Sequence, residues 1–441
     1  MPSSTRRNTE LGLIILALLI TVAAYALAGI GRTSSIPANI WPFLGIVLGL
    51  LVAAHLFNRR LVPRADGILL PLAALLNGIG YVFIARLNQN LADNQAAWTG
   101  LGIVAYVATL LVVRRARDLQ RYRYTFMVIG LGLLLLPLVP FVGREINGAQ
   151  IWVSVGPINF QPGEFAKIAL AVFFAGYLVD KRELLGMATW PGFRPMLPDP
   201  KHLGPVLVAW GVSLLVMVTQ KDLGSSLLFF ALFILMVWIS TERSAYLAVG
   251  TALFAAGAYF AWSTFGHVED RIVTWLNPWP DGQREGFQVI QSWFALAWGG
   301  MSGTGIGLGE PDRIPVVETD FIFSAIGEEL GLFGAAAVIT TFLLIIGAGL
   351  RIAVRSTEPF EKLLAAGLTV LIGIQAFIIM AGVTRLLPLT GVTLPFVSYG
   401  GSSLLANYVL LALLMRISDD GAARVELAEA RAAPLVEADR E

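Results

Sequence analysis

The 441-residue chain contains no cysteine and few charged residues, and both absences narrow its chemistry. Without cysteine there is no disulfide, no thiolate metal site and no cysteine nucleophile. Charged residues make up only 14% of the chain, whereas soluble domains carry about 25%. The net charge of +1 gives no indication of a nucleic-acid partner. The low share of charged residues favours a membrane protein over a soluble one.

Apolar residues take the place of charge, because 56% of the chain is hydrophobic and its mean hydropathy is +0.72. Runs of about 17–25 apolar residues, the length that crosses a bilayer, recur along the chain. They predict an all-α polytopic integral membrane protein with about twelve transmembrane helices. The predicted spans are 11–31, 41–57, 67–86, 96–113, 125–142, 164–179, 203–219, 223–240, 244–263, 321–347, 362–384 and 399–416.

The basic residues predict the orientation, because short cytoplasmic loops are enriched in Lys and Arg. With the N-terminus inside, 22 of the 31 basic residues fall in inner segments. Both termini are therefore predicted to be cytoplasmic. Three polar connections then face outward. They are 143–163, the large outer loop 264–320 between the ninth and tenth spans, and 385–398.

We predict three parts along the chain. Residues 1–66 hold an N-terminal pair of spans, and residues 67–418 form the membrane core with its outer loop 264–320. Residues 419–441 are Ala-rich and charged and are predicted to be a mobile inner tail. Within the core, the Pro- and Gly-rich inner segment 180–202 is expected to be a surface connector.

The outer loop ends at Asp320, where the chain enters an apolar helix that also carries Glu328 and Glu329. Desolvation at the mouth of a span raises the pKa of a carboxyl toward the range of a general base. The structural alternative for Asp320 is a helix cap stabilised by the helix dipole. The two deeper acids are interpreted as structural, paired with Lys167 or Arg385.

Other outer-face residues are candidates for substrate binding, each with a structural alternative. Glu164 and Lys167 are three residues apart, so they can pair on one helix face or line an outer cavity. Trp152 is either an interfacial belt residue or a site residue. Asp222 is more readily interpreted as the cap of the next helix. The segment 299–309 lacks the Lys-Ser/Thr of a phosphate-binding loop and is interpreted as a flexible or closely packed hinge.

Five ordered blocks resemble the SEDS (shape, elongation, division and sporulation) family of RodA/FtsW type. The blocks are GAQIW (148–152), QPGEFAK (161–167), QKDLG (220–224), TDFIF (319–323) with GEELG (327–331), and LPFVSYGGSS (394–403). The resemblance implies a ten-helix core, so the spans 11–31 and 41–57 are an added pair. It also implies a peptidoglycan glycosyltransferase that polymerises lipid II at the outer face of the bacterial plasma membrane. The partner that it implies is a class B penicillin-binding protein.

The resemblance assigns the catalytic role to Asp320, the acid of the TDF block. Trp152, Glu164 and Lys167 match positions that are functionally important in relatives, and Asp222 and Ser398 lie in the third and fifth blocks. The implied reaction is inverting, with lipid II as both donor and acceptor. Asp320 takes the proton of the acceptor 4-hydroxyl, and undecaprenyl diphosphate leaves the donor.

The charge that develops on the leaving diphosphate needs cationic stabilisation, for which Lys167, Arg271 and Arg385 are candidates. No metal-binding motif is present, so no cofactor is assigned, and a divalent cation (Mg²⁺ or Mn²⁺) is left open. Arg385 departs from the family pattern, where a small residue is frequent.

Two other functions are alternatives, a lipid II flippase and a polymerase or ligase of another lipid-linked glycan. The flippase is disfavoured because the polar residues crowd the outer half of the predicted bundle. A role in elongation is not distinguished from a role in division.

Overall fold

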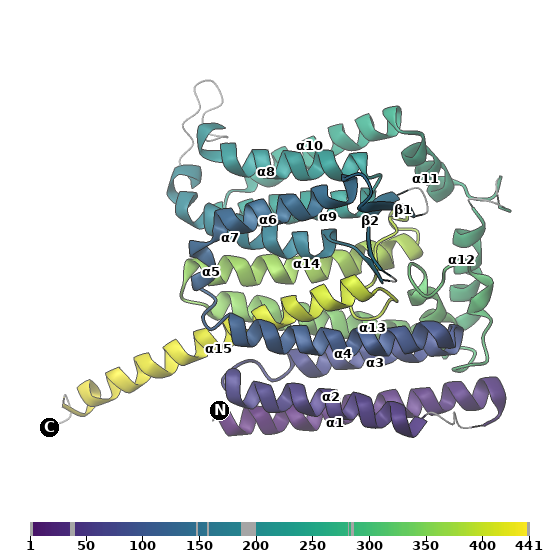
Figure 1. Ribbon diagram of the computed structural model, residues 1–441, viewed down its shortest axis with the longest axis horizontal. Helices are drawn as coiled ribbons and strands as arrows, with labels where there is room; N and C mark the ends of the chain where they lie inside the picture. Colours follow the sequence, from purple (N-terminus) through teal and green to yellow (C-terminus); the bar gives the residue numbers. More distant parts are fainter. Residues whose placement is uncertain are drawn as a thin grey trace.

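The computed structural model describes residues 3–35, 40–146, 149–156, 158–186, 200–280, 282–283 and 286–438. Most of the predicted inner connector, residues 187–199, lies outside these ranges, as do Gly148 of the first block and the last three residues of the tail. The long helices run roughly parallel to one another in a single bundle (Figure 1).

A helix corresponds to each of the twelve predicted spans. These helices are α1 (Ser3–Thr33), α2 (Ile40–Leu61), α3 (Leu69–Leu87), α4 (Gln89–Val112), α6 (Arg123–Leu135), α7 (Gly163–Gly186), α8 (Pro200–Thr219), α9 (Leu223–Thr241), α10 (Ser244–Thr264), α13 (Ile322–Arg355), α14 (Pro359–Val383) and α15 (Gly401–Ala438). The short helices α5 (Asp118–Arg121) and η1 (Leu136–Leu138) flank α6.

Eight of these helices, within the described residues, are long and apolar enough to cross a membrane. They are α1, α3, α4, α9, α10, α13, α14 and α15, and shorter apolar stretches lie at 123–138 and 207–216. A helix suits a bilayer because it satisfies its own backbone hydrogen bonds. The chain is thus a multi-pass membrane protein, while the full count of twelve spans stays a prediction.

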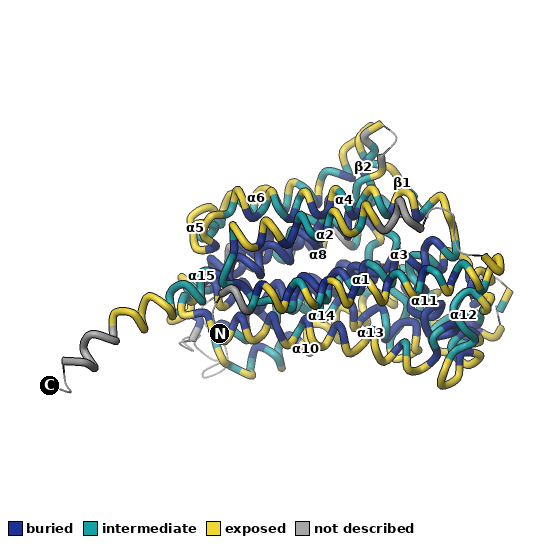
Figure 2. Tube along the Cα trace, turned by 90° about the horizontal axis from the view of Figure 1, so that it is seen from below, coloured by how far each residue is buried: buried dark blue, intermediate teal, exposed yellow. Residues whose placement is uncertain are grey.

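The most buried of these eight helices are α15, α14 and α3, whose apolar windows are 78%, 72% and 72% buried. The corresponding window of α10 is only 11% buried, so this helix lies at the periphery with its apolar side chains directed outward. Figure 2 shows the same gradient, with buried segments inside the bundle and exposed ones on its surface. Apolar residues on a lipid-facing surface are expected of a membrane protein.

The all-α prediction is wrong in the first outer connection, which forms a small antiparallel sheet. Its strands are β1 (Gly143–Ile146), β2 (Ala149–Val155) and β3 (Ile158–Phe160), in the order β1-β2-β3. Trp152 on β2 stands opposite Arg144 on β1. Strands of three to seven residues leave only a short period-two pattern, which long apolar runs on either side obscure.

The large outer loop is also more ordered than its name suggests. It contains α11 (Gly266–Leu276), α12 (Phe287–Gly299) and the short helix η2 (Pro311–Arg313). In Figure 1 these helices and the sheet lie at one end of the bundle, and both chain termini lie at the other. The predicted outer connections therefore do gather at a common end.

The last helix continues past the predicted end of its span at residue 416. Asp419 accepts a hydrogen bond from the backbone N–H of Arg64 at 2.7 Å, and Asp420 accepts one from Ala116 at 2.8 Å. The predicted tail boundary at 419 therefore falls inside a helix that is bound to the core. Arg424 still pairs with Glu361 of α14, and Glu426 pairs with Arg64 at 2.5 Å. Beyond these pairs α15 projects away from the bundle (Figure 1).

Candidate active site

Asp320 lies at a cavity of about 280 Å³ at the outer-loop end of the bundle. Its walls come from α11, α12, the end of α14 and the last outer connection, residues 385–398. The lining residues are Arg271, Thr274, Trp275, Gln288, Val289, Trp293, Asp320, Gly382, Arg385, Leu389 and Gly391. Three of the predicted site residues, Asp320, Arg271 and Arg385, thus surround one space.

The electrostatic surroundings of Asp320 suit a general base. Burial raises the pKa of Asp320 to about 6, and the negative charge of Glu318 acts in the same direction. The Thr319 side chain and the positive charge of Arg271 oppose this rise. Near neutral pH the carboxylate is then mostly ionised and still basic enough to accept a proton.

The capping alternative for Asp320 does not hold in the structure. The N-cap position of α13 belongs to Phe321, and no side chain caps this helix. The turn before the helix is instead held by Ser398, whose hydroxyl donates to the carbonyl of Thr319 at 2.5 Å. The same hydroxyl accepts the N–H of Leu394 at 2.9 Å. Ser398 therefore ties the last outer connection to the residue next to Asp320.

The two arginines of the cavity are positioned by backbone carbonyls. Arg271 donates to a carbonyl of the last outer connection at 3.2 Å, and Arg385 donates to the carbonyl of Leu276 at 2.8 Å. The guanidinium of Arg385 lies 4.8 Å from the ring centre of Trp293, in cation–π geometry. Within the described residues, neither arginine forms an ion pair with Asp320. Their charges remain available for an anionic ligand.

Glu164 and Lys167 form a buried ion pair at 2.8 Å near the start of α7. Lys167 also donates to the side-chain oxygen of Gln375 at 3.2 Å. The amide of Gln375 in turn donates to the carbonyl of Thr393 at 2.9 Å. The pair is thus joined to the last outer connection, but it does not line the cavity of Asp320.

Asp222 and Trp152 also lie outside this cavity. Asp222 is the N-cap of α9 and accepts the N–H of Ser225 at 3.0 Å, as the capping interpretation predicts. Burial raises the pKa of Asp222, while hydrogen bonds from Ser225 and the charge of Lys167 oppose the rise. Trp152 belongs to the sheet and is partly buried. Their roles in the reaction stay predictions.

The expected pairing of the deeper acids with Lys167 or Arg385 is wrong. Glu329 pairs with Arg86 of α3 at 2.6 Å, and Glu328 accepts a backbone N–H of the outer loop at 2.7 Å. The reason is that the glycine-rich part of the outer loop folds back along α13 and supplies N–H donors there. The structural role assigned to both acids is consistent with these contacts.

Several residues of the site escaped the sequence analysis because 264–320 was treated as a loop. Gln288 and Trp293 lie on α12 and line the cavity. The indole N–H of Trp293 is buried without a partner among the described residues. Their signal was the helical spacing of apolar residues within 287–299. Gln375 was hidden in an apolar span, where a lone amide is a weak cue.

The donor set around Asp320 does not fit a resident divalent cation. The cavity presents one carboxylate and two guanidinium groups. Among the described residues no group of three or more His, Asp or Glu side chains is placed to hold a metal ion. Divalent cations of the Mg²⁺ type prefer several oxygen ligands. No step of the reaction is therefore assigned to a metal ion, and the divalent cation stays a prediction.

Comparison with known families and relatives gives one consistent result. Residues 68–422 match the FtsW/RodA/SpoVE family model, described as cell cycle protein. The peptidoglycan glycosyltransferase RodA of Mycobacterium tuberculosis is 44% identical over 428 residues, which is 95% of this chain and 91% of the relative. The probable peptidoglycan glycosyltransferase FtsW of Geobacter metallireducens is 35% identical over 82% of this chain and 96% of the relative.

Solved structures agree with the sequence relatives. A chain from a peptidoglycan synthase complex, studied for its coordination of polymerization and crosslinking, has a TM-score of 0.66 and 27% identity. That match covers 81% of this chain and 98% of the solved one. The rod shape determining protein RodA of Thermus thermophilus has a TM-score of 0.58 and 26% identity, over 81% of this chain and 97% of the solved one.

Proposed function

Because the chain belongs to the FtsW/RodA/SpoVE family and is a peptidoglycan glycosyltransferase of cell-wall synthesis, we propose that it polymerises lipid II into β-1,4-linked glycan strands. The observation that carries the proposal is the cavity that Asp320 lines together with the guanidinium groups of Arg271 and Arg385. A basic carboxylate and two cations are what proton removal from a hydroxyl and release of a diphosphate require.

We place the cavity at the outer face of the plasma membrane, with twelve spans and both termini in the cytoplasm. The positive-inside bias of the loops supports this orientation. The arrangement of the bundle supports it too, since the sheet, α11 and α12 lie at the end opposite the termini (Figure 1). An outer active face gives access to a lipid-linked disaccharide that has already crossed the membrane.

In the proposed reaction Asp320 accepts the proton of the GlcNAc 4-hydroxyl of the acceptor lipid II. The oxygen attacks the anomeric carbon of the donor MurNAc from the face opposite the diphosphate. The new C–O bond forms as the bond to the diphosphate breaks, and the bonding electrons leave with its oxygen. The configuration inverts, which gives the β-1,4 linkage. The protonated Asp320 then releases its proton to water.

Arg271 and Arg385 stabilise the diphosphate as it departs in this scheme. Their carbonyl contacts pre-orient both guanidinium groups, so little reorganisation is needed when negative charge develops. Lys167 does not line the cavity, and its pair with Glu164 serves better to fix α7 against Gln375. We assign this pair, Trp152, Asp222 and Ser398 to supporting roles.

The proposed partner is a class B penicillin-binding protein that cross-links the strands. The support is indirect: the solved relative belongs to a complex that coordinates polymerization with crosslinking. A polymerase and a cross-linking enzyme acting on one strand benefit from proximity. Elongation and division are both compatible with this partner class.

The flippase alternative depends on where polar groups lie along the depth of the bundle. Polar groups do not crowd the outer half alone, because Arg7, Glu10 and His55 form a buried cluster near the termini. These inner groups are paired with one another and do not line the cavity of Asp320. Asp320 and its two arginines, by contrast, form one compact site around a single cavity, which favours an enzyme over a flippase.

The test is a polymerisation assay with purified protein in vesicles that contain labelled lipid II, with and without a cognate penicillin-binding protein. Long muramidase-sensitive strands are expected. Lipid II that changes leaflet without forming polymer would indicate a flippase. Polymer from a different lipid-linked glycan, and none from lipid II, would indicate the other alternative.

A further inference from the structure

The outer end of α1 is in direct backbone contact with the glycine-rich loop, which we define as residues 299–309. A Cβ atom on Gly31 would lie 2.4 Å from the carbonyl oxygen of Ile306. A Cβ atom on Gly307 would lie 2.7 Å from the carbonyl oxygen of Ala28. A Cβ atom cannot lie this close to a carbonyl oxygen. The two segments can therefore meet only because both contact positions are glycine.

The glycine-rich loop is in turn hydrogen-bonded to α13. The N–H of Thr304 donates to the carbonyl of Glu328 at 2.9 Å, and that of Gly305 donates to the carbonyl of Glu329 at 3.0 Å. The Glu329 carboxylate accepts the N–H of Gly307 at 2.9 Å. Helix α13 is kinked at Gly331, whose φ of 65° is not helical. The contacts with the loop lie beside this kink, at the end of the short helical segment that begins next to Asp320. The loop thus fixes this segment at its far end.

Arg86 of α3 also links α1, the glycine-rich loop and α13. Its guanidinium donates to Glu329 at 2.6 Å and to the carbonyl of Gly309 at 2.5 Å. Its own carbonyl accepts a hydrogen bond from Arg32, at the end of α1, at 2.9 Å. Helix α1 therefore contacts the glycine-rich loop directly and through Arg86.

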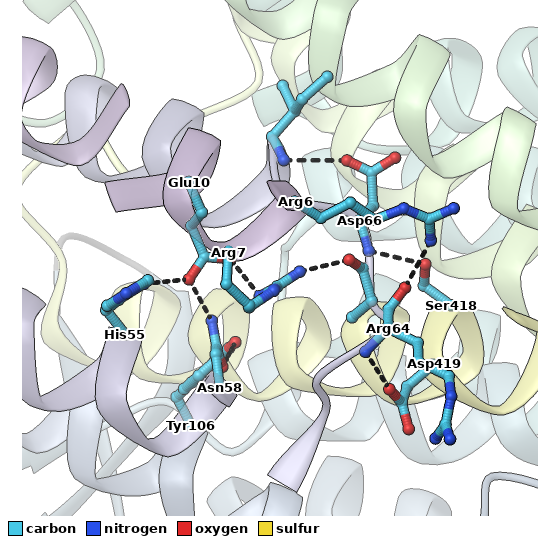
Figure 3. A network of polar contacts seen from close by, with 12 residues as sticks. Arg6, Arg7, Glu10, His55, Asn58, Arg64, Asp66, Tyr106, Ser418 and Asp419 are labelled. Atoms are coloured by element: carbon cyan, nitrogen blue, oxygen red, sulfur yellow. Dashed lines mark hydrogen bonds and ion pairs between the residues drawn. The ribbon is translucent and has the colours of Figure 1, made fainter. Parts of the chain in front are cut away.

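The inner end of α1 is fixed as well (Figure 3). The carboxylate of Glu10 binds Arg7 on its own helix and the ring of His55 on α2, the latter at 2.8 Å. Arg7 also donates to the carbonyl of Ala65, in the connection to α3. All of these side chains are buried. A shift of α1 relative to α2 would separate these buried partners and leave a buried charge without its partner, which is costly. The cluster therefore fixes the position of α1.

We propose that the N-terminal helix pair is a positioning element of the active site, in which α1 presses its outer end, Ala28 to Arg32, against the glycine-rich loop and so holds the start of α13 and Asp320 in register. This inference rests on the proposed function, since it assumes that Asp320 does the chemistry. It gives a role to the helix pair that lies outside the ten-helix core.

The alternative is that the pair only anchors the chain in the bilayer. An anchor needs apolar length and does not need two glycines at a backbone contact. It also does not need an arginine that bridges from its end to the neighbouring helix. The contacts at Gly31 and Arg32 therefore favour positioning over anchoring.

Gly31→Leu is the test substitution, and Gly12→Leu is its matched control on the same helix. A Cβ atom on Gly12 meets nothing within 4 Å, so the control adds the same volume without a clash. Purified variants are compared in thermal unfolding, kcat, KM for lipid II and the pH dependence of kcat/KM. The result expected for Gly31→Leu is a loss of kcat of at least about tenfold with little change in KM, since a misplacement of ~1 Å can cost on the order of 100-fold.

The pH profile separates positioning from general destabilisation. If the start of α13 shifts, Asp320 becomes more hydrated and the acid limb of the profile moves to lower pH. Gly12→Leu should keep the wild-type kcat and profile. Should Gly31→Leu not fold, Arg32→Gln removes only the bond to the Arg86 carbonyl and should give a smaller change in the same direction.

A folded Gly31→Leu or Arg32→Gln protein with wild-type kcat and wild-type acid limb would overturn the inference. Asp320→Asn, assayed in parallel, separates this failure from failure of the proposed function. If Asp320→Asn is inactive and both α1 variants are normal, only the positioning role is lost. If Asp320→Asn retains full activity, the proposed function itself is wrong.

Discussion

The hydroxyl of Ser398 donates a 2.5 Å hydrogen bond to the carbonyl oxygen of Thr319, one residue before Asp320. Two segments almost 80 residues apart in sequence therefore meet beside the proposed base. Ser398→Ala should lower kcat by about tenfold or more, because the residue next to the proposed base loses its anchor and a small misplacement is costly to the rate. It should also lower the melting temperature, because it leaves a carbonyl and an N–H without partners at a cost of ~1–3 kcal/mol each. Ser226→Ala is the control, since that hydroxyl bonds only within its own helix end. Equal kinetics in both variants would remove Ser398 from the site.

Arg271 is expected to serve both substrate binding and the ionisation of Asp320. Its positive charge lowers the pKa of Asp320, so Arg271→Ala should move the acid limb of the pH profile to higher pH. It should also weaken release of the diphosphate and lower kcat by roughly 10–100-fold. Arg313→Ala is a suitable control, because that arginine is exposed and does not line the cavity. An unchanged acid limb in Arg271→Ala would contradict the assignment.

Much of the bundle could be predicted because membrane helices are long and leave a strong apolar signal. Each predicted span corresponds to a helix, and the alternation of the spans puts the predicted outer connections on one side, where Figure 1 shows the sheet, α11 and α12. The sheet around Trp152 and the helices inside 264–320 were missed, because short amphipathic elements compete poorly with runs of 20 apolar residues.

The site was predictable only in part for a related reason. Asp320, Arg271 and Arg385 are polar residues in or next to outer connections, where a sequence makes them conspicuous. Which of them share a cavity depends on how α11 and α12 fold over the bundle, and no local pattern reports that. The partner of Glu329 proved to be Arg86, 243 residues away, and such a distant pairing is set by tertiary packing.

The buried pair of Glu164 and Lys167 gives a prediction about stability. Lys167→Met should lower the apparent melting temperature, because an unpaired buried carboxylate costs about 3–5 kcal/mol. The double variant Glu164→Gln with Lys167→Met should recover part of that loss, since no charge is then left without its partner. Thermal unfolding in detergent measures both. Additive losses in the double variant would show that the two side chains do not depend on each other.

The raised pKa of Asp320 predicts how both the activity and the thermal stability of the protein depend on pH. Activity should fall as the pH drops through about 6, where the base becomes protonated. The pKa of Asp320 in the folded protein lies above the ordinary value of 3.8. Ionisation of this carboxyl therefore lowers the free energy of unfolding as the pH rises from about 4 to about 6. Asp320→Asn should therefore melt at a higher temperature than wild type at pH 7. A lower melting temperature would mean that the carboxylate has a stabilising partner.

The most direct measurement of the central claim is polymer formation from purified lipid II by Asp320→Asn beside Glu318→Gln. Asn keeps the shape of the side chain but cannot take the proton of the acceptor hydroxyl. Glu318 is the neighbouring acid, and it does not line the cavity. The account predicts no strands from Asp320→Asn, strands from Glu318→Gln, and folded protein in both cases. Strands of normal length and rate from Asp320→Asn would contradict it.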